Sequence, residues 1–184
     1  MALTEPFIVY LLGYPGVGKY TIGRALAAQT GAVLIDNQMI NHPILALFNR
    51  GVDLPDGAFD RAAPIRDAVF STLEEIAPPS LSYVFTNNLE DKPEDIAIYN
   101  RLHDIAASRD SAFLPVMLTC AREVQLERVQ TEERRGRLKV TDAEWLDEFM
   151  TSVPLYSPAG VMTLDTTEAT PEESAAAIVE RLRG

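Results

Sequence analysis

Phosphate-binding residue types at the matching spacing occur near the N-terminus, in the stretch GYPGVGKYT over residues 13–21. Gly13, Gly18 and Lys19 fit the pattern of a glycine, four residues, a second glycine and a lysine. Glycines allow successive backbone N–H groups to converge on an anion, and a helix N-terminus adds positive potential there. Lys19 is then expected to reach the β- and γ-phosphates of a nucleoside triphosphate. The predicted nucleotide-binding residues of this loop are Gly13, Pro15, Gly16, Val17, Gly18, Lys19, Tyr20 and Thr21.

The residue after Lys19 departs from the usual pattern. A serine or threonine hydroxyl normally coordinates Mg²⁺ at that position, whereas this chain has Tyr20. A phenol oxygen lies several bonds farther from the backbone, and Thr21 points about 100° further around a helix, so neither is a simple replacement. Nucleotide binding is therefore better supported than catalysis that depends on Mg²⁺.

The elements that position this loop alternate between short apolar segments and segments of helical composition, which predicts a parallel α/β sheet with helices on both faces. Strands are expected over residues 7–12, 32–35, 81–86, 112–119 and 160–164. Helices are expected over residues 19–30, 38–48, 62–76, 93–107, 122–134, 142–150 and 171–183. No internal repeat or linker interrupts the pattern, so we expect one domain over residues 1–184.

Polar residues at the carboxyl ends of the strands are further candidates, because ligands of open parallel sheets bind there. Asp36 follows the second strand and has two interpretations. It caps the next helix, or it faces the same cleft as Lys19, where a carboxylate accepts the proton of an attacking hydroxyl or holds a metal-bound water. Asn87 and Asn88 follow the third strand and suit a turn as well as a substrate contact.

Basic residues concentrate in one segment of this acidic chain, at Arg128, Arg134, Arg135, Arg137 and Lys139. They either pair with neighbouring glutamates on a solvated helix face or belong to a lid that moves at Gly136, which interrupts the helix. Phosphoryl transfer depends on positioned positive charge, so we favour a lid in which at least one arginine meets phosphate.

The composition limits the classes of partner. The chain has 16 basic and 27 acidic residues and a formal net charge of −11, which argues against nonspecific binding to nucleic acid or to anionic membranes. The single cysteine, Cys120, excludes an intrachain disulfide and fits a reducing compartment. No stretch approaches the roughly 18 apolar residues of a membrane span, and the N-terminus lacks signal-peptide features, so we expect a cytoplasmic protein.

With these residues in place, the chain resembles the small P-loop kinases, a group that includes nucleoside monophosphate, shikimate, gluconate and antibiotic phosphotransferases. The resemblance implies a three-layer P-loop NTPase fold with a five-stranded parallel sheet in the order 2-3-1-4-5. It also implies a substrate-binding segment at about residues 38–65 and a lid at about residues 128–141.

The same resemblance implies roles for individual residues. Asp36 matches an acid near the acceptor hydroxyl and Mg²⁺, and Arg66 resembles an arginine that grips the acceptor substrate. Arg128 resembles a helix arginine that stacks on adenine, and Thr166 falls in a loop that lines the base. Lid arginines that reach the transferred phosphoryl group fall at Arg134, Arg135 and Arg137, of which Arg134 and Arg137 are the catalytic candidates. The family pattern has an acid after the third strand, where this chain has Asn87 and Asn88 instead.

The leading hypothesis is an ATP-dependent phosphotransferase that uses Mg²⁺ and acts on a small hydroxyl- or phosphate-bearing metabolite. The alternative is an ATP-binding module with weak or no catalysis, because Tyr20 replaces the usual metal ligand. A GTP-hydrolysing switch is less well supported, since NNLEDK over residues 87–92 is not the Asn-Lys-x-Asp run that reads guanine. The sequence does not identify the acceptor.

Overall fold

A parallel sheet forms the centre of the protein. The structure, a computed structural model, describes residues 3, 5–48, 54–55, 57–131 and 140–184. The strands are β1 (Phe7–Leu12), β2 (Val33–Asp36), β3 (Tyr83–Thr86), β4 (Ala112–Thr119) and β5 (Met162–Asp165). They pair in parallel in the order β2-β3-β1-β4-β5, which confirms the predicted topology.

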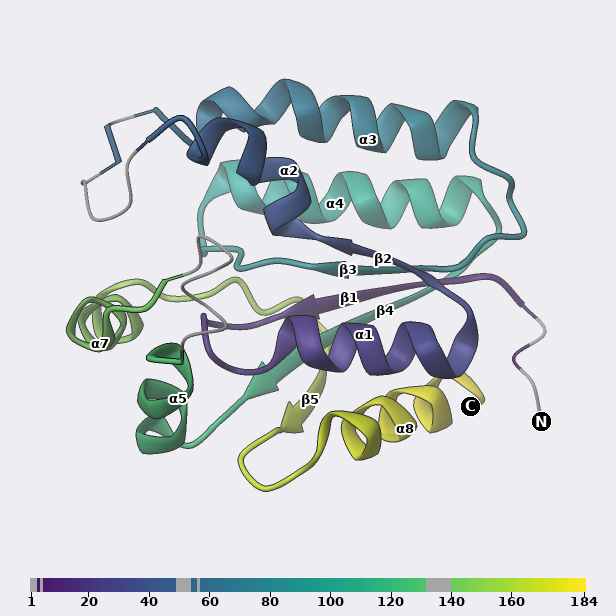
Figure 1. The fold of residues 1–184 in the computed structure, drawn as a ribbon. Helices are drawn as coiled ribbons and strands as arrows, with labels where there is room; N and C mark the ends of the chain where they lie inside the picture. Colours follow the sequence, from purple (N-terminus) through teal and green to yellow (C-terminus); the bar gives the residue numbers. More distant parts are fainter. Residues whose placement is uncertain (1–2, 4, 49–53, 56, 132–139) are drawn as a thin grey trace.

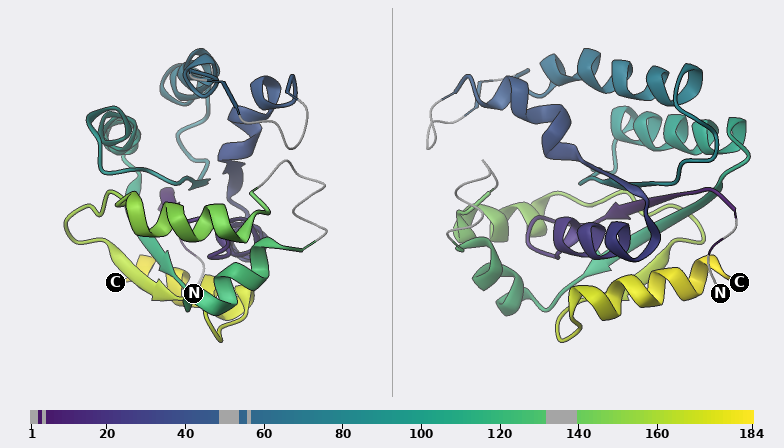
Figure 2. Two further views of the ribbon diagram at one scale, coloured as in Figure 1. Left: turned by 90° about the vertical axis from the view of Figure 1, so that its left-hand side faces the viewer. Right: turned by 45° about the vertical axis from the view of Figure 1, so that its right-hand side comes forward.

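Helices cover both faces of the sheet, as Figures 1 and 2 show. One face carries α1 (Lys19–Thr30) and α8 (Pro171–Leu182), and the other carries α3 (Ala63–Glu75) and α4 (Pro93–Ser108). Side chains of β1 alternate between the two layers: Val9 and Leu11 pack in the core with α1 and α8, and Ile8 and Tyr10 pack in the core with α3 and α4. Burial on both faces explains why β1 is an unbroken apolar run.

Three helices lie at the carboxyl ends of the strands, where the phosphate loop was predicted. These are α2 (Asn37–Leu45), α5 (Arg122–Val129) and α7 (Ala143–Ser152), and a short 3₁₀ helix, η1 (Asp60–Ala62), precedes α3. The start of β1 and the end of α8 lie at the opposite end of the sheet (Figure 1). The fold therefore separates both from the candidate site.

The helix predicted over residues 122–134 is wrong at its C-terminal end, because α5 ends at Val129. The Gln130 amide donates a hydrogen bond to the carbonyl of Glu127, three residues back. The Thr131 hydroxyl donates to the carbonyl of Arg128 at 3.2 Å. A threonine hydroxyl competes with the backbone for the last helical carbonyls, which favours an end at this point.

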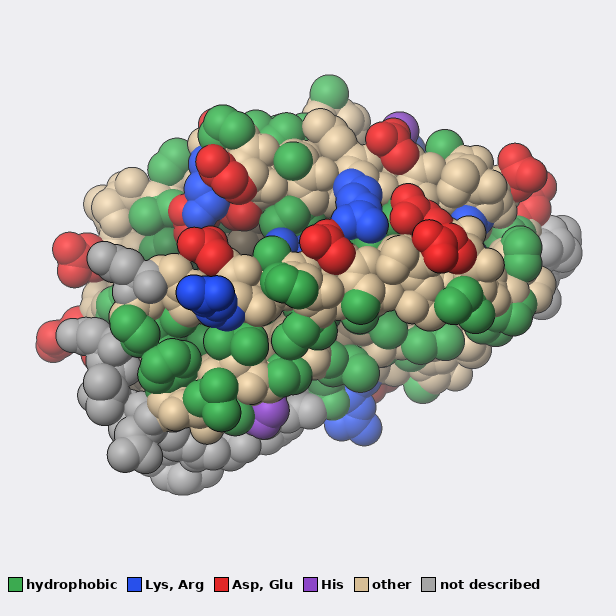
Figure 3. Space-filling view, turned by 90° about the horizontal axis from the view of Figure 1, so that it is seen from above, with side chains coloured by type: hydrophobic (Ala, Val, Ile, Leu, Met, Phe, Trp, Pro, Cys, Tyr) green, Lys and Arg blue, Asp and Glu red, His purple; other side chains and the backbone are tan. Residues whose placement is uncertain are grey.

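Charged side chains are interspersed on the face that carries α3 (Figure 3). Arg101 of α4 pairs there with Asp67 of α3 at 2.5 Å and with Glu74 of α3 at 3.6 Å. Exposed pairs of this kind contribute little stability but satisfy the charges that link the two helices. Among the described residues, no helix is long and apolar enough to cross a membrane.

Candidate nucleotide-binding site

The loop between β1 and α1 has the backbone conformation of an anion-binding turn. Gly13, Gly16 and Gly18 have φ values of 138°, 93° and 95°, a region that side chains with a Cβ disfavour. Gly18 is the N-cap residue of α1, and its carbonyl accepts the hydrogen bond of the Ile22 amide at 2.9 Å. The N-terminus of α1 therefore opens directly onto the loop, as the sequence predicted.

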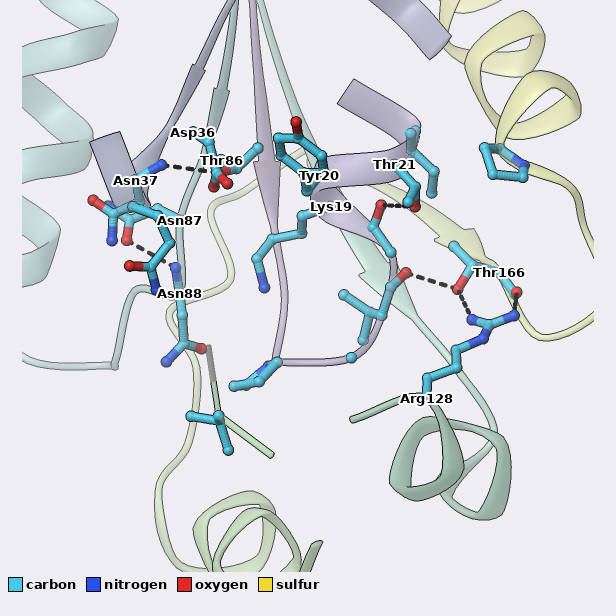
Figure 4. Close-up of a pocket in the computed structure, with 18 of the residues that line it drawn as sticks. Lys19, Tyr20, Thr21, Asp36, Asn37, Thr86, Asn87, Asn88, Arg128 and Thr166 are labelled. Atoms are coloured by element: carbon cyan, nitrogen blue, oxygen red, sulfur yellow. Dashed lines mark hydrogen bonds between the residues drawn. The ribbon is translucent and has the colours of Figure 1, made fainter. Parts of the chain in front are cut away.

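Lys19 folds back over the loop. Its ammonium group donates hydrogen bonds to the carbonyl oxygens of Gly13 and of Tyr14, the second at 2.8 Å. In Figure 4 the ammonium group lies between two groups of polar residues, with Asp36, Thr86, Asn87 and Asn88 on one side and Thr166 and Arg128 on the other. Lys19 is thus positioned at the centre of the site.

A cavity of about 400 Å³ occupies this end of the sheet. Its lining includes the predicted loop residues from Pro15 to Thr21, but not Gly13, together with Asp36, Asn87, Arg128 and Thr166. The other lining residues are Ile22, Asn37, Gln38, Thr86, Asn88, Thr131, Val140, Ala169 and Pro171. A site of this size suits a small-molecule ligand.

Asp36 is the N-cap residue of α2, but its side chain makes no capping hydrogen bond. Instead the carboxylate accepts a 2.6 Å hydrogen bond from the hydroxyl of Thr86, and both side chains are buried. The sheet register places Asp36 of β2 directly beside Thr86 of β3, and the same hydroxyl accepts the Asn37 amide at 3.1 Å. Of the two interpretations of Asp36, the structure favours the one in which the carboxylate faces the cavity.

Asn87 lines the cavity, yet its side chain has structural partners. Its Nδ2 donates to the hydroxyl of buried Tyr10 at 2.9 Å, and its Oδ1 accepts the Asn88 amide at 2.8 Å. Burial raises the pKa of the Tyr10 hydroxyl, which therefore stays neutral and available as a hydrogen-bond partner. The turn interpretation of Asn87 accounts for these bonds, and its substrate contact stays a prediction.

Tyr20 and Thr21 line the same cavity from the first turn of α1. The Tyr20 ring extends away from the Lys19 ammonium group in Figure 4, and the guanidinium of Arg24 lies 5.9 Å from the ring centre. The Thr21 hydroxyl donates to the Gly18 carbonyl at 2.9 Å. Neither hydroxyl takes the place of the missing serine or threonine beside Lys19.

The Asp36 carboxylate, which lines the same cavity as Lys19, is the kind of oxygen ligand that suits Mg²⁺ bound with a nucleotide. No cluster of three or more His, Cys, Asp or Glu residues that could hold a metal ion occurs in the described part of the chain. Mg²⁺ sites of this kind use one or two carboxylates, waters and the phosphates of the substrate. The Asp36 carboxylate beside Lys19 meets that requirement.

Hydrogen bonds of Arg128 and Thr166 connect α5, the end of β4 and the end of β5 to the phosphate loop. The Arg128 guanidinium donates to the Thr166 carbonyl at 2.9 Å and to the Thr167 carbonyl at 3.2 Å. The Thr166 hydroxyl lies 2.9 Å from the Val17 carbonyl oxygen and 3.0 Å from the Thr119 carbonyl oxygen, and it can donate its one hydrogen to either. Both predicted nucleotide-binding residues therefore lie at the cavity wall and also stabilise it.

Arg66 does not line the main cavity. It borders a small neighbouring cavity of about 10 Å³, together with Tyr10, Asn37 and Asn87. Its Nε is buried and has no hydrogen-bond partner within the described part of the chain. Arg134, Arg135 and Arg137, which the lid prediction needs, lie outside the described residues.

Sequence reasoning missed three residues at the site. Thr86 is named in the sequence only as the end of the third strand, and Gln125 falls in a predicted helix; in the structure Thr86 positions Asp36, and Gln125 donates to the Pro15 carbonyl at 2.7 Å. Tyr14 also escaped notice: its hydroxyl donates to the Val153 carbonyl at 2.7 Å, and its ring packs on Phe149 of α7 at 5.8 Å. Only the sheet register and the packing of helices reveal such contacts.

Solved structures share this fold over nearly the whole chain. A sugar kinase from a Janibacter species is 19% identical, with 97% of this chain and 95% of that chain covered and a TM-score of 0.64. A gluconokinase from Sinorhizobium meliloti is 18% identical, with 98% of both chains covered and a TM-score of 0.60. A shikimate kinase from Acinetobacter baumannii, in complex with shikimate, is 19% identical, with 98% and 94% covered and a TM-score of 0.60.

The sheet order, the phosphate loop and these neighbours give the chain the fold of the small P-loop kinases. No protein-family model and no curated protein matches the sequence. At identities below a fifth, the likeness establishes the fold, and the function has to be argued from the site.

Proposed function

We propose that this chain is a phosphotransferase that moves the γ-phosphoryl group of ATP to a small hydroxyl- or phosphate-bearing molecule. The observation that carries the proposal is that the phosphate loop, Lys19 and the Asp36 carboxylate line one cavity of about 400 Å³. The subsite for the phosphoryl donor and a candidate general base therefore lie in the same cavity. The fold, which sugar, gluconate and shikimate kinases also have, supports this reaction class.

Each residue has a defined part in the proposed transfer. The loop amides and Lys19 bind the β- and γ-phosphates, and Asp36 accepts the proton of the acceptor hydroxyl. The acceptor oxygen bonds to the γ-phosphorus as the bond to the bridging oxygen breaks, and ADP leaves with that electron pair. Thr86 holds the Asp36 carboxylate by its 2.6 Å hydrogen bond, which keeps the base oriented.

Two further parts of the proposal concern charge. Mg²⁺ bound to the phosphates would neutralise charge that develops during transfer, and Asp36 is the carboxylate that would hold it. Arg134 and Arg137 are proposed to reach the transferred phosphoryl group from a lid over residues 128–141. Positioned cations of this kind supply most of the rate enhancement in phosphoryl transfer.

The acceptor is proposed to enter beside Asp36, where two side-chain amides line the cavity. These are the amides of Gln38 and Asn88, each of which offers a donor and an acceptor to a bound hydroxyl or amine. A site that hydrogen-bonds such a group rejects analogues that lack it. We propose that the acceptor is a small molecule and that the protein is cytoplasmic.

The test is transfer of radiolabelled phosphate from γ-labelled ATP, with Mg²⁺, to a panel of sugars, nucleotides and hydroxy acids. We expect a labelled product with at least one acceptor and its loss in Lys19→Ala. Lys92→Ala is the matched control, because Lys92 pairs with Glu90 at 3.0 Å and does not line the cavity. No transfer across the panel, with ATP binding that needs no metal, would instead favour the noncatalytic ATP-binding module.

A further inference from the structure

Helix α5 contacts the phosphate loop through a buried glutamine that the proposed chemistry does not use. Gln125 is 3% exposed, and its Nε2 donates a 2.7 Å hydrogen bond to the carbonyl of Pro15. Pro15 and Gly16 line the cavity, whereas Gln125 does not. The glutamine therefore holds the loop from the side that faces away from the ligand.

This contact fixes the direction of one loop amide. In a trans peptide the C=O and N–H groups of one unit point in opposite directions, and no cis peptide occurs in the described part of the chain. Since the Pro15 carbonyl points to Gln125, the Gly16 N–H points to the opposite side, which is the cavity. Anions bind in turns whose N–H groups point inward in this way.

Gln125 also packs against the loop backbone at Gly16. A Cβ at Gly16 would lie 2.9 Å from the Cγ of Gln125 and 3.0 Å from its carbonyl oxygen. The loop and α5 are thus in direct contact. Gly16 has a φ of 93° at this point, and any side chain there would collide with Gln125. The hydrogen bond and the packing constrain the same peptide unit.

The neighbouring carbonyls are held as well. The Thr166 hydroxyl lies 2.9 Å from the Val17 carbonyl oxygen, and Lys19 donates to the carbonyls of Gly13 and Tyr14. A triphosphate that drew Lys19 away would take this donor from the Gly13 and Tyr14 carbonyls, whereas Gln125 does not line the cavity and would not be displaced. The hydrogen bond from Gln125 to the Pro15 carbonyl therefore does not depend on whether a ligand is bound.

We propose that Gln125 is a positioning residue that keeps the Gly16 amide aimed at the phosphate site before a nucleotide binds. The inference rests on the proposed function only in that a triphosphate is the ligand of the loop. A loop that is already ordered loses less conformational entropy on binding, which raises affinity.

The decisive variant is Gln125→Met, which keeps the unbranched chain and its contact with Gly16 but lacks the donor. Calorimetry with inorganic triphosphate should show binding about 5- to 20-fold weaker than in the wild type. The ¹⁵N heteronuclear NOE of the Gly16 amide should fall without ligand and recover at saturation, while that of Gly31 stays unchanged. Gln130→Met is the matched control, because Gln130 is exposed at the end of α5 and its side chain donates to the Leu126 carbonyl rather than to the loop.

The outcomes separate this inference from the proposed function. If Lys19→Ala binds triphosphate as tightly as the wild type, the proposed function fails and the inference fails with it. If Lys19→Ala binds weakly but Gln125→Met matches the wild type in affinity and in the Gly16 NOE, only the positioning role is overturned. Should the methionine variant not fold, the same measurements on Gln125→Leu decide, since leucine also lacks a donor for the Pro15 carbonyl.

Discussion

Replacing Gly16 by alanine tests whether packing against α5 defines the phosphate loop. The added Cβ would meet the Cγ of Gln125 and a methyl group of Val129, each at 2.9 Å. The backbone φ of 93° adds a second penalty, because residues with a Cβ rarely adopt it. Gly31→Ala is the matched control: Gly31 has a φ of 77°, and apart from its chain neighbours no atom of the described residues would lie within 4 Å of its added Cβ.

The difference between the two variants isolates the collision. Left-handed backbone costs about 1–2 kcal/mol for an alanine in either variant. Overpacking against two side chains adds about 1–3 kcal/mol in Gly16→Ala alone. The free energy of unfolding should therefore fall by about 1–3 kcal/mol more in Gly16→Ala than in Gly31→Ala, unless the loop moves and relieves the contact.

Urea denaturation followed by circular dichroism measures the unfolding free energies, and calorimetry with inorganic triphosphate measures the site. If the loop moves to relieve the collision, its N–H groups no longer point into the cavity. The unfolding free energy would then change little, but the affinity for triphosphate would fall. Equal unfolding free energies for the two variants, with wild-type triphosphate affinity in Gly16→Ala, would refute the argument that α5 shapes the loop.

Three further changes test other parts of the site and fold. Asp36→Asn keeps an oxygen that accepts the Thr86 hydrogen bond, so triphosphate affinity should be retained while the transfer rate falls about 10²- to 10⁴-fold in the phosphate assay. Tyr20→Ser supplies the missing hydroxyl, so calorimetry with and without Mg²⁺ should show a larger gain in ATP affinity from the metal than in the wild type; an unchanged gain would contradict this. Hydrogen bonds from the Thr170 amide and hydroxyl lower the pKa of Glu173, so its carboxylate stabilises the fold above the ordinary glutamate pKa and this contribution is lost as the pH falls through the lowered value. The gap in urea midpoint between wild type and Glu173→Gln should accordingly narrow from about pH 7 to about pH 3, and a constant gap would count against it.

The sequence predicted the sheet and the phosphate loop because both depend on local patterns. The predicted strands over residues 7–12 and 112–119 coincide with β1 and β4, since unbroken apolar runs mark strands covered on both faces. The loop was predictable from Gly13, Gly18 and Lys19, because glycine spacing reports backbone conformation directly. Asp36 was predictable by position, as the last residue of a strand.

The supports of the site were not predictable in the same way. Thr86 acts on Asp36 across 50 positions of sequence, and Gln125 acts on Pro15 across 110. Nothing in the local pattern around either residue distinguishes it from an ordinary strand or helix residue. Such contacts depend on the register of β2 with β3 and on where α5 meets the loop, which emerge only when the whole sheet is assembled.

The arrangement of these supports suggests how binding and the candidate base are kept independent. Thr86 orients Asp36 from β3, whereas Gln125 and Thr166 hold the loop from α5 and from the end of β5. Lys19 lies between the two groups (Figure 4) and donates hydrogen bonds to the loop carbonyls of Gly13 and Tyr14. Substitutions at Thr86 should therefore alter transfer more than triphosphate affinity, and substitutions at Gln125 should do the reverse, because no described hydrogen bond connects the two supports.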